Sequence, residues 1–163
     1  MEYERINITL CGGAGLGIQT VEYIFTKLLN DNGYLFYASK EYESRVRGGE
    51  NSTTIQISNK ERKAFSKRID LLIPFDKGAI PHLKKRIEKN TLIFSEKEFV
   101  EDGISFYEFP IKKLAKEAGL PQGLNSVALG FLCYLFNLKG AEKYLKGFFG
   151  GKGEEILIKN LRA

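Results

Sequence analysis

The chain has 163 residues, of which 43% are hydrophobic and 28% are charged, and its formal net charge is +5. This size and composition are typical of one globular domain with a single core, so we expect residues 1–163 to form one domain. The first residues show no charged and apolar pattern of a cleavable secretory signal, so we expect the cytoplasm as the compartment. No apolar run reaches the roughly 18 residues that cross a membrane, and the basic runs lack the aromatic interleaving of a nucleic-acid surface. We therefore expect neither a membrane nor a nucleic acid as partner.

Cysteine and histidine are too scarce for most metal chemistry. The two cysteines, Cys11 and Cys133, are far apart in the sequence, and His82 is the single histidine. Zinc and iron–sulfur sites need sets of such ligands at short spacing. We expect no metal to be bound by this chain alone, and we interpret Cys133, within an apolar helix, as a core residue.

The first patterned stretch joins a strand to a helix. Residues 6–10 alternate in polarity as a strand does, and apolar residues recur at helical spacing over 18–29. Between them stand Gly13, Gly15 and Gly17, which allow positive φ and close approach to the backbone. The N-terminus of the following helix would add unpaired N–H donors, so the turn suits an anion.

The spacing of these glycines departs from the known nucleotide motifs. A G-x-G-x-x-G fingerprint would need a third glycine where Ile18 stands, and the acidic residue expected about 20 positions later is replaced by the mixed sequence at 39–41. A P-loop is excluded because no Gly-Lys-Ser/Thr follows. A turn that only lets strand and helix pack closely remains the alternative.

A charged loop follows the second expected strand. It contains Arg45 and Arg47, and Gly48 and Gly49 come directly after them. Two guanidinium forks beside residues that allow close backbone approach suit a phosphate, a carboxylate or a salt-bridged subunit contact. A turn carrying two solvated charges is the alternative.

The rest of the chain alternates between strand and helix patterns. Expected strands lie at 34–38, 53–58, 69–75, 91–94 and 104–109, and expected helices at 80–87, 111–118, 127–138, 141–149 and 156–161. This rhythm predicts an α/β fold with a three-layer αβα, Rossmann-like architecture and a mostly parallel sheet. The helix at 127–138 is apolar nearly all round, which suits burial in the core or under a partner subunit. The next helix has an aromatic face of Tyr144, Phe148 and Phe149, and we expect both helices to contact partner subunits.

Two motifs together resemble the gamma subunit, or gamma domain, of 2-oxoacid:ferredoxin oxidoreductases. These are GGAGLGIQT at 12–20 and EYESRVRGGENSTTIQIS at 41–58. The resemblance continues through IDLLIPFD, an apolar strand ending in an acid, through NSVALGFL, where an asparagine opens a buried helix, and to Asn160 and Ala163. It covers essentially the whole chain. The turn differs from the commonest family sequence, because Ala14 precedes Gly15 and a glutamine comes only at Gln19.

This resemblance implies a non-catalytic part of an enzyme that oxidatively decarboxylates a 2-oxoacid, such as pyruvate or 2-oxoglutarate, with coenzyme A. The products would be acyl-CoA, CO2 and reduced ferredoxin. The complex would use thiamine diphosphate, magnesium, iron–sulfur clusters and coenzyme A, and this chain would join alpha-, beta- and delta-type subunits. The loop is closest to forms in which the gamma domain is fused ahead of the alpha subunit, as in 2-oxoglutarate-type enzymes.

The chain lacks the residues that thiamine chemistry needs. A thiamine site uses Gly-Asp-Gly followed by asparagine, whereas the sequence here has Asp102-Gly103 preceded by Glu101. We therefore predict that the chain alone is inactive and that it serves assembly and the covering of coenzyme A. The candidate ligand residues are the three turn glycines and the four residues of the arginine loop. A stand-alone nucleotide- or NAD-binding domain is the alternative function.

Overall fold

The computed structural model describes residues 5–42, 49–59 and 66–163. Their strands form one six-stranded sheet in the order β2-β3-β1-β4-β5-β6. The strands are β1 (Arg5–Gly13), β2 (Leu35–Tyr42), β3 (Glu50–Ser58), β4 (Leu71–Pro74), β5 (Leu92–Ser95) and β6 (Tyr107–Glu108). β1, β4, β5 and β6 are parallel neighbours, whereas β3 is antiparallel to both β1 and β2. The predicted α/β fold with a mostly parallel sheet is confirmed, with an antiparallel pair at one edge.

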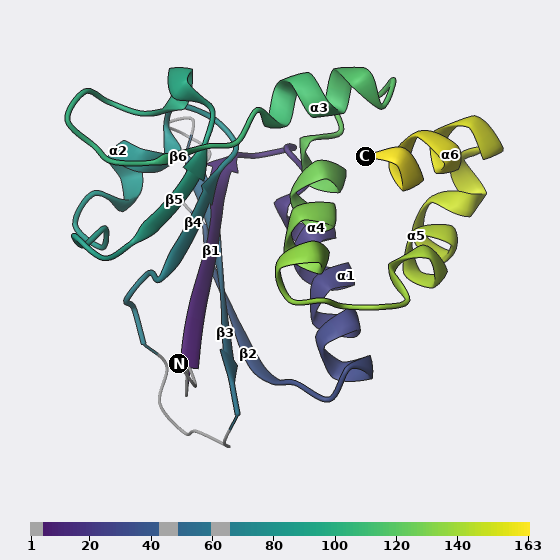
Figure 1. The fold of residues 1–163 in the computed structure, drawn as a ribbon, viewed down its shortest axis with the longest axis horizontal. Helices are drawn as coiled ribbons and strands as arrows, with labels where there is room; N and C mark the ends of the chain where they lie inside the picture. The colour runs from purple at the N-terminus through teal and green to yellow at the C-terminus, as the bar shows by residue number, and fades with distance from the viewer. Residues whose placement is uncertain (1–4, 43–48, 60–65) are drawn as a thin grey trace.

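Helices cover both faces of this sheet unequally. They are α1 (Ile18–Asp31), α2 (Ala79–Leu83), α3 (Ile111–Glu117), α4 (Leu124–Leu135), α5 (Ala141–Phe149) and α6 (Glu154–Arg162), with short 3-10 turns at Lys97–Phe99 and Gly150–Lys152. Figure 1 shows α1, α4, α5 and α6 on one side of the sheet and α2 on the other. The result is a three-layer arrangement with one thick and one thin helical layer.

The main core lies between the sheet and α1 with α4. Ile8 and Leu10 of β1 point toward α1, whose Ile24, Phe25 and Leu28 are fully buried. Each such side chain contributes about 1.5–3 kcal/mol when it leaves water. A smaller cluster on the opposite face joins Cys11, Leu72 and Ile93 of the strands to Ala79, Ile80 and Leu83 of α2.

Strand β2 extends further than its hydrophobic pattern predicts. The expected strand ends at residue 38, but pairing with β3 continues through Ser39, Lys40 and Glu41 to Tyr42. The two charged side chains are accommodated on opposite faces, since Lys40 forms an ion pair with Glu22 (2.8 Å) and Glu41 forms one with Arg86 (2.9 Å). At the other edge the expected strand over 104–109 contracts to the two residues of β6.

Helices α4 and α5 use much of their apolar surface within the chain. The first two turns of α4 are buried in the chain's own core, as the first of the two expectations for this helix had it, whereas Tyr134 near its end is 86% exposed. The aromatic face of α5 is occupied within the chain, because Phe149 is buried, Phe148 lies against Tyr23, and the Tyr144 hydroxyl donates to Asp31 (2.6 Å). That face is therefore covered in part within the chain, since Tyr144 and Phe148 stay half-buried, and its contact with a partner subunit stays a prediction.

Candidate functional site

The glycine turn after β1 is built from left-handed backbone. Gly15 has φ +94° and Gly17, which precedes α1, has φ +80°, conformations that L side chains rarely adopt. A Cβ at Gly17 would also lie 2.7 Å from the side-chain amide nitrogen of Asn125 in α4. The turn therefore requires glycine at both positions, at Gly17 for packing as well as for backbone geometry.

A carboxylate from the next parallel strand holds this turn in place. Asp76 follows β4, and its Oδ2 accepts a hydrogen bond from the Gly13 N–H (2.7 Å) while its Oδ1 accepts one from the Gly78 N–H (2.9 Å). β4 is aligned beside β1 by its own pairing, in which Cys11 is level with Pro74. Asp76 thus connects the end of β1 to the loop between β4 and α2 through one carboxyl group.

A cavity of about 850 Å³ opens at this turn. Its lining comes from three segments: residues 13–20 of the turn and the start of α1, Tyr42 at the end of β2, and Gly49 with residues 51–53 at the start of β3. The Gln19 side-chain amide donates to the Tyr42 hydroxyl across this space (3.2 Å). The volume is within the range of small-molecule and cofactor sites.

The electrostatics of the cavity wall favour a negative group. The first N–H groups of α1 have no acceptor within their own helix, the helix dipole is positive at this end, and the first turn of α1 contains no acidic residue. Both oxygens of Asp76 already accept backbone hydrogen bonds, and the other carboxylate beside the turn, Glu50, is level with Gly13 at the start of β3 and is not among the lining residues. The arrangement can accept an anion by backbone donors, and the lining residues that the structure describes include no Asp, Glu, His, Lys or Cys.

The fold brings four of the seven predicted site residues together around the cavity. Gly13, Gly15, Gly17 and Gly49 all line the cavity. Arg45, Arg47 and Gly48 lie outside the described residues, so their prediction stays open. Sequence reasoning missed the contributions of Tyr42 and Asp76; the signal for the second was an acid at the end of a strand expected to lie parallel to the first.

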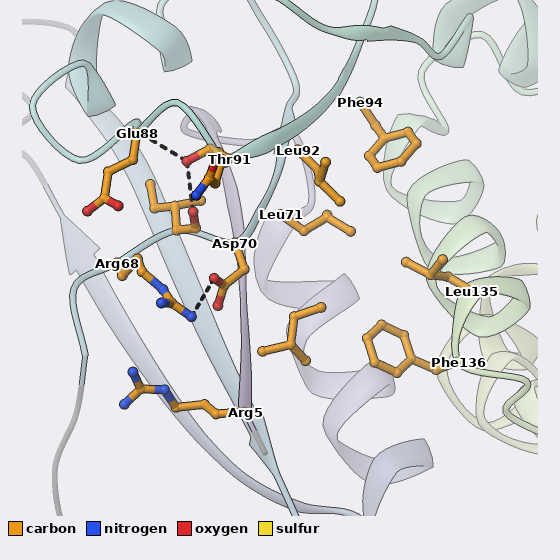
Figure 2. Close-up of a pocket in the computed structure, with 13 residues that line it drawn as sticks. Arg5, Arg68, Asp70, Leu71, Glu88, Thr91, Leu92, Phe94, Leu135 and Phe136 are labelled. Carbon is orange, nitrogen blue, oxygen red and sulfur yellow. Dashed lines mark hydrogen bonds and ion pairs between the residues drawn. The ribbon is translucent and has the colours of Figure 1, made fainter. Parts of the chain in front are cut away.

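A second cavity, of about 570 Å³, lies at the opposite end of the strands, where β1, β4 and β5 begin. Figure 2 shows its apolar walls, with Leu92 and Phe94 facing Leu135 and Phe136. Polar groups at its rim interact with each other, as in the Arg68–Asp70 ion pair (2.8 Å). Ligands of open α/β sheets bind at the carboxyl ends of the strands, so the glycine turn is the better candidate.

Metal ligands and a reactive thiol are the other features that could support chemistry in the described residues. Within residues 5–42, 49–59 and 66–163 no three His, Cys, Asp or Glu side chains are grouped as metal ligands. Burial raises the pKa of the Cys133 thiol from 9.0 to about 11, which keeps it protonated at neutral pH. Over the same described ranges, none of the helices is both long and apolar enough to cross a bilayer.

Comparison with protein families gives one match over nearly the whole chain. The model described as pyruvate ferredoxin/flavodoxin oxidoreductase matches residues 7–163. Among curated proteins, the alpha subunit of a 2-oxoacid:ferredoxin oxidoreductase from a Sulfolobus species is 33% identical over 72 residues, which is 44% of this chain and 11% of that protein. The corresponding protein of Saccharolobus solfataricus is 30% identical over 91 residues, 56% of this chain and 14% of its own length. The chain thus corresponds to a small part of these relatives.

Solved structures share the fold. The 2-oxoglutarate:ferredoxin oxidoreductase from Magnetococcus marinus, with 2-oxoglutarate, coenzyme A and succinyl-CoA bound, superposes with a TM-score of 0.83 and 26% identity, over 98% of this chain and 30% of that one. The gamma subunit of a keto/oxoacid ferredoxin oxidoreductase from Geobacter sulfurreducens superposes with a TM-score of 0.71 at 18% identity, over 96% and 93% of the two chains. A pyruvate oxidoreductase subunit from Thermotoga maritima gives 0.72 at 17% identity, over 98% and 93%.

Proposed function

Because the chain belongs to the pyruvate ferredoxin/flavodoxin oxidoreductase family, we propose that it works as the gamma-type part of a 2-oxoacid:ferredoxin oxidoreductase. In that reaction the bond between the carboxylate and the keto carbon breaks, CO2 leaves, the acyl group passes to the thiol of coenzyme A, and two electrons pass to ferredoxin. Pyruvate and 2-oxoglutarate are the substrates that the relatives suggest.

We propose that the role of this chain in the reaction is to contact coenzyme A. The observation that carries this proposal is the cavity at the glycine turn, where backbone donors at the start of α1 converge without an acidic side chain. Coenzyme A presents phosphates that such donors suit, and the Magnetococcus relative was solved with coenzyme A bound. Gly13, Gly15, Gly17 and Gly49 would border the phosphate, and Arg45, Arg47 and Gly48 are proposed from the sequence as further contacts.

The other cofactors are proposed to be held by partner subunits. Thiamine diphosphate, magnesium and the iron–sulfur clusters need ligand sets for which the described part of this chain offers no group. We therefore assign them to alpha-, beta- and delta-type subunits or domains, with residues 1–163 as one gamma-type domain beside them. The chain contributes binding surface and assembly, and the electron transfer takes place elsewhere in the complex.

Hydrogen exchange in the assembled complex tests this proposal directly. If coenzyme A contacts the turn, adding it should slow amide exchange in residues 13–20 and leave the start of α5 unchanged. Unchanged exchange in the turn at saturating coenzyme A would remove the coenzyme-facing role. The alternative, a stand-alone NAD-binding domain, would instead show saturable NAD binding by the isolated chain, followed through the fluorescence of its eight tyrosines.

A further inference from the structure

The outer edge of β2 is open to a second strand. Within the described ranges, β2 pairs on one side, with β3, and stands last in the order of the sheet. Six of its eight residues are exposed. An edge strand of this length presents a row of outward backbone N–H and C=O groups, which a second strand can pair with.

Large apolar side chains stand along this edge. Tyr42 is 59% exposed, Tyr37 57%, Leu35 48% and Phe36 37%. Phe36 and Tyr42 are on the face that carries α1, since Phe36 is level with Ile57 of the main core and side chains alternate along a strand. An aromatic-rich edge is costly for a chain that stays alone, because it invites pairing.

The charges that usually guard an edge strand are neutralised within the chain. Lys40 is paired with Glu22 of α1 (2.8 Å), and Glu41 is paired with Arg86 (2.9 Å), whose guanidinium also donates to Thr54 (3.1 Å). Because each charge already has an opposite partner on its own face, neither opposes an incoming strand strongly. The usual protection against edge pairing is therefore absent from the middle of β2.

We propose that β2 pairs antiparallel with β2 of a second copy of this chain, so that the two sheets become continuous. In such a dimer a two-fold axis runs perpendicular to the sheet, and the same face of both sheets points the same way. Residues that lie opposite each other share a face, so their sequence numbers must differ by an even number. With the axis at Ser39, Phe36 lies opposite Tyr42 of the second copy, and the same pair forms again on the other side of the axis. Cross-strand aromatic pairs are stabilising.

Neighbouring registers are less favourable. An axis at Lys40 would place Tyr42 opposite Ala38 of the second copy and lose both pairs between Phe36 and Tyr42. An axis at Ala38 would place Phe36 opposite Lys40 and lose the two aromatic pairs. An axis at Tyr37 would pair this tyrosine with its own copy but leave Phe36 opposite Ala38. Among the registers centred on residues 37–40, the one at Ser39 forms two aromatic pairs within β2, and this self-complementarity favours a second copy as the occupant over an unrelated strand.

Cysteine cross-linking tests the register. In a Cys133→Ser background, the Ser39→Cys variant should form a disulfide-linked dimer under mild oxidation, since facing residues of antiparallel strands have Cα atoms about 4.5–5.5 Å apart. The matched Tyr37→Cys variant should not, because its copy would be displaced by four residues, roughly 13 Å along the strand. Equal cross-linking at both positions, or none at residue 39, would overturn the proposal.

Light scattering over a concentration series tests the association itself. The unmodified chain should show a concentration-dependent dimer, and Phe36→Lys should weaken that dimer at least about tenfold, because it places two new charges in the pairs. Tyr134→Lys, at an exposed aromatic residue away from β2, is the control and should leave the mass unchanged. A chain that stays monomeric at all concentrations would overturn the proposal. Neither test uses a substrate, so the outcome is independent of the proposed function.

Discussion

The carboxylate of Asp76 accepts a hydrogen bond of 2.7 Å from the backbone N–H of Gly13, although 63 positions separate the two residues. This contact ties the end of β4 to the turn at the end of β1, where the candidate cavity opens. The shape of the turn therefore depends on a side chain from another strand as well as on its own glycines.

Removing this carboxylate should destabilise the fold. Asp76→Ala leaves the Gly13 and Gly78 N–H groups without their acceptor, and hydrogen bonds to a charged group contribute about 1.5–3 kcal/mol, so we expect the free energy of unfolding to fall by about 2–4 kcal/mol. Urea denaturation measures this. Asp76→Asn should recover part of the loss, since its one oxygen can accept from one of the two groups. Asp102→Ala, at an exposed loop residue, should change little.

Gly15→Ala should raise the Michaelis constant for coenzyme A in the assembled enzyme. The residue has φ +94° with open space around the added methyl group, and it lines the cavity, so we expect a change of roughly tenfold, equal to about 1.4 kcal/mol of binding. Gly140→Ala is a closely matched control, because Gly140 has φ +92°, equally open space and a position away from the cavity. Both variants should lose similar stability. An equal effect of both on the Michaelis constant would mean that strain, and not the cavity, is responsible.

Arg47→Ala tests the loop that the sequence singles out. If the guanidinium contacts an anionic group of coenzyme A, its loss removes about 1.5–3 kcal/mol, and the Michaelis constant should rise by about one to two powers of ten. Arg5→Ala, at the start of β1 and thus at the opposite end of that strand, serves as the control. A lower yield of complex with an unchanged Michaelis constant would instead assign Arg47 to a subunit contact, and no change in either would leave it as a solvated charge.

The purified chain alone should not reduce a dye acceptor in the presence of a 2-oxoacid and coenzyme A. The reaction needs thiamine diphosphate and iron–sulfur clusters, which we assign to other subunits. The assembled complex, assayed with the same dye, is the positive control. Turnover by the isolated chain would contradict the proposed division of labour.

The thiol of Cys133 should react slowly with thiol reagents. Its pKa is raised by burial to about 11, so at pH 8 the reactive thiolate is a far smaller fraction than in a thiol of pKa 9.0. The same shift has a stability consequence: the unfolded thiol ionises first, so stability is complete below about pH 9 and falls as pH rises toward 11. Labelling rates and denaturation measured over this pH range check both effects. Cys133→Ser should remove the part of the pH dependence that this thiol contributes, while Lys40 and Tyr144, whose pKa values are also raised, go on contributing.

The elements with strong local patterns were predictable from the sequence. Ile18, Val21 and Phe25 of α1 recur at helical spacing and are all buried, as expected for one apolar face. Predictions failed where contacts with neighbouring strands and helices outweigh the local hydrophobic pattern. Ser39, Lys40 and Glu41 became strand because β3 supplies a full ladder and two ion pairs absorb the charges.

By itself the sequence determined the turn between β1 and α1, because positive φ at Gly15 and Gly17 is a matter of local backbone sterics. It also determined the family, through motifs spread over the chain. Only the tertiary structure decided that β3 lies antiparallel between β1 and β2, that Asp76 meets Gly13, and that the aromatic face of α5 is used within the chain. These depend on which distant segments pack together, and side-chain periodicity carries no information about distant partners.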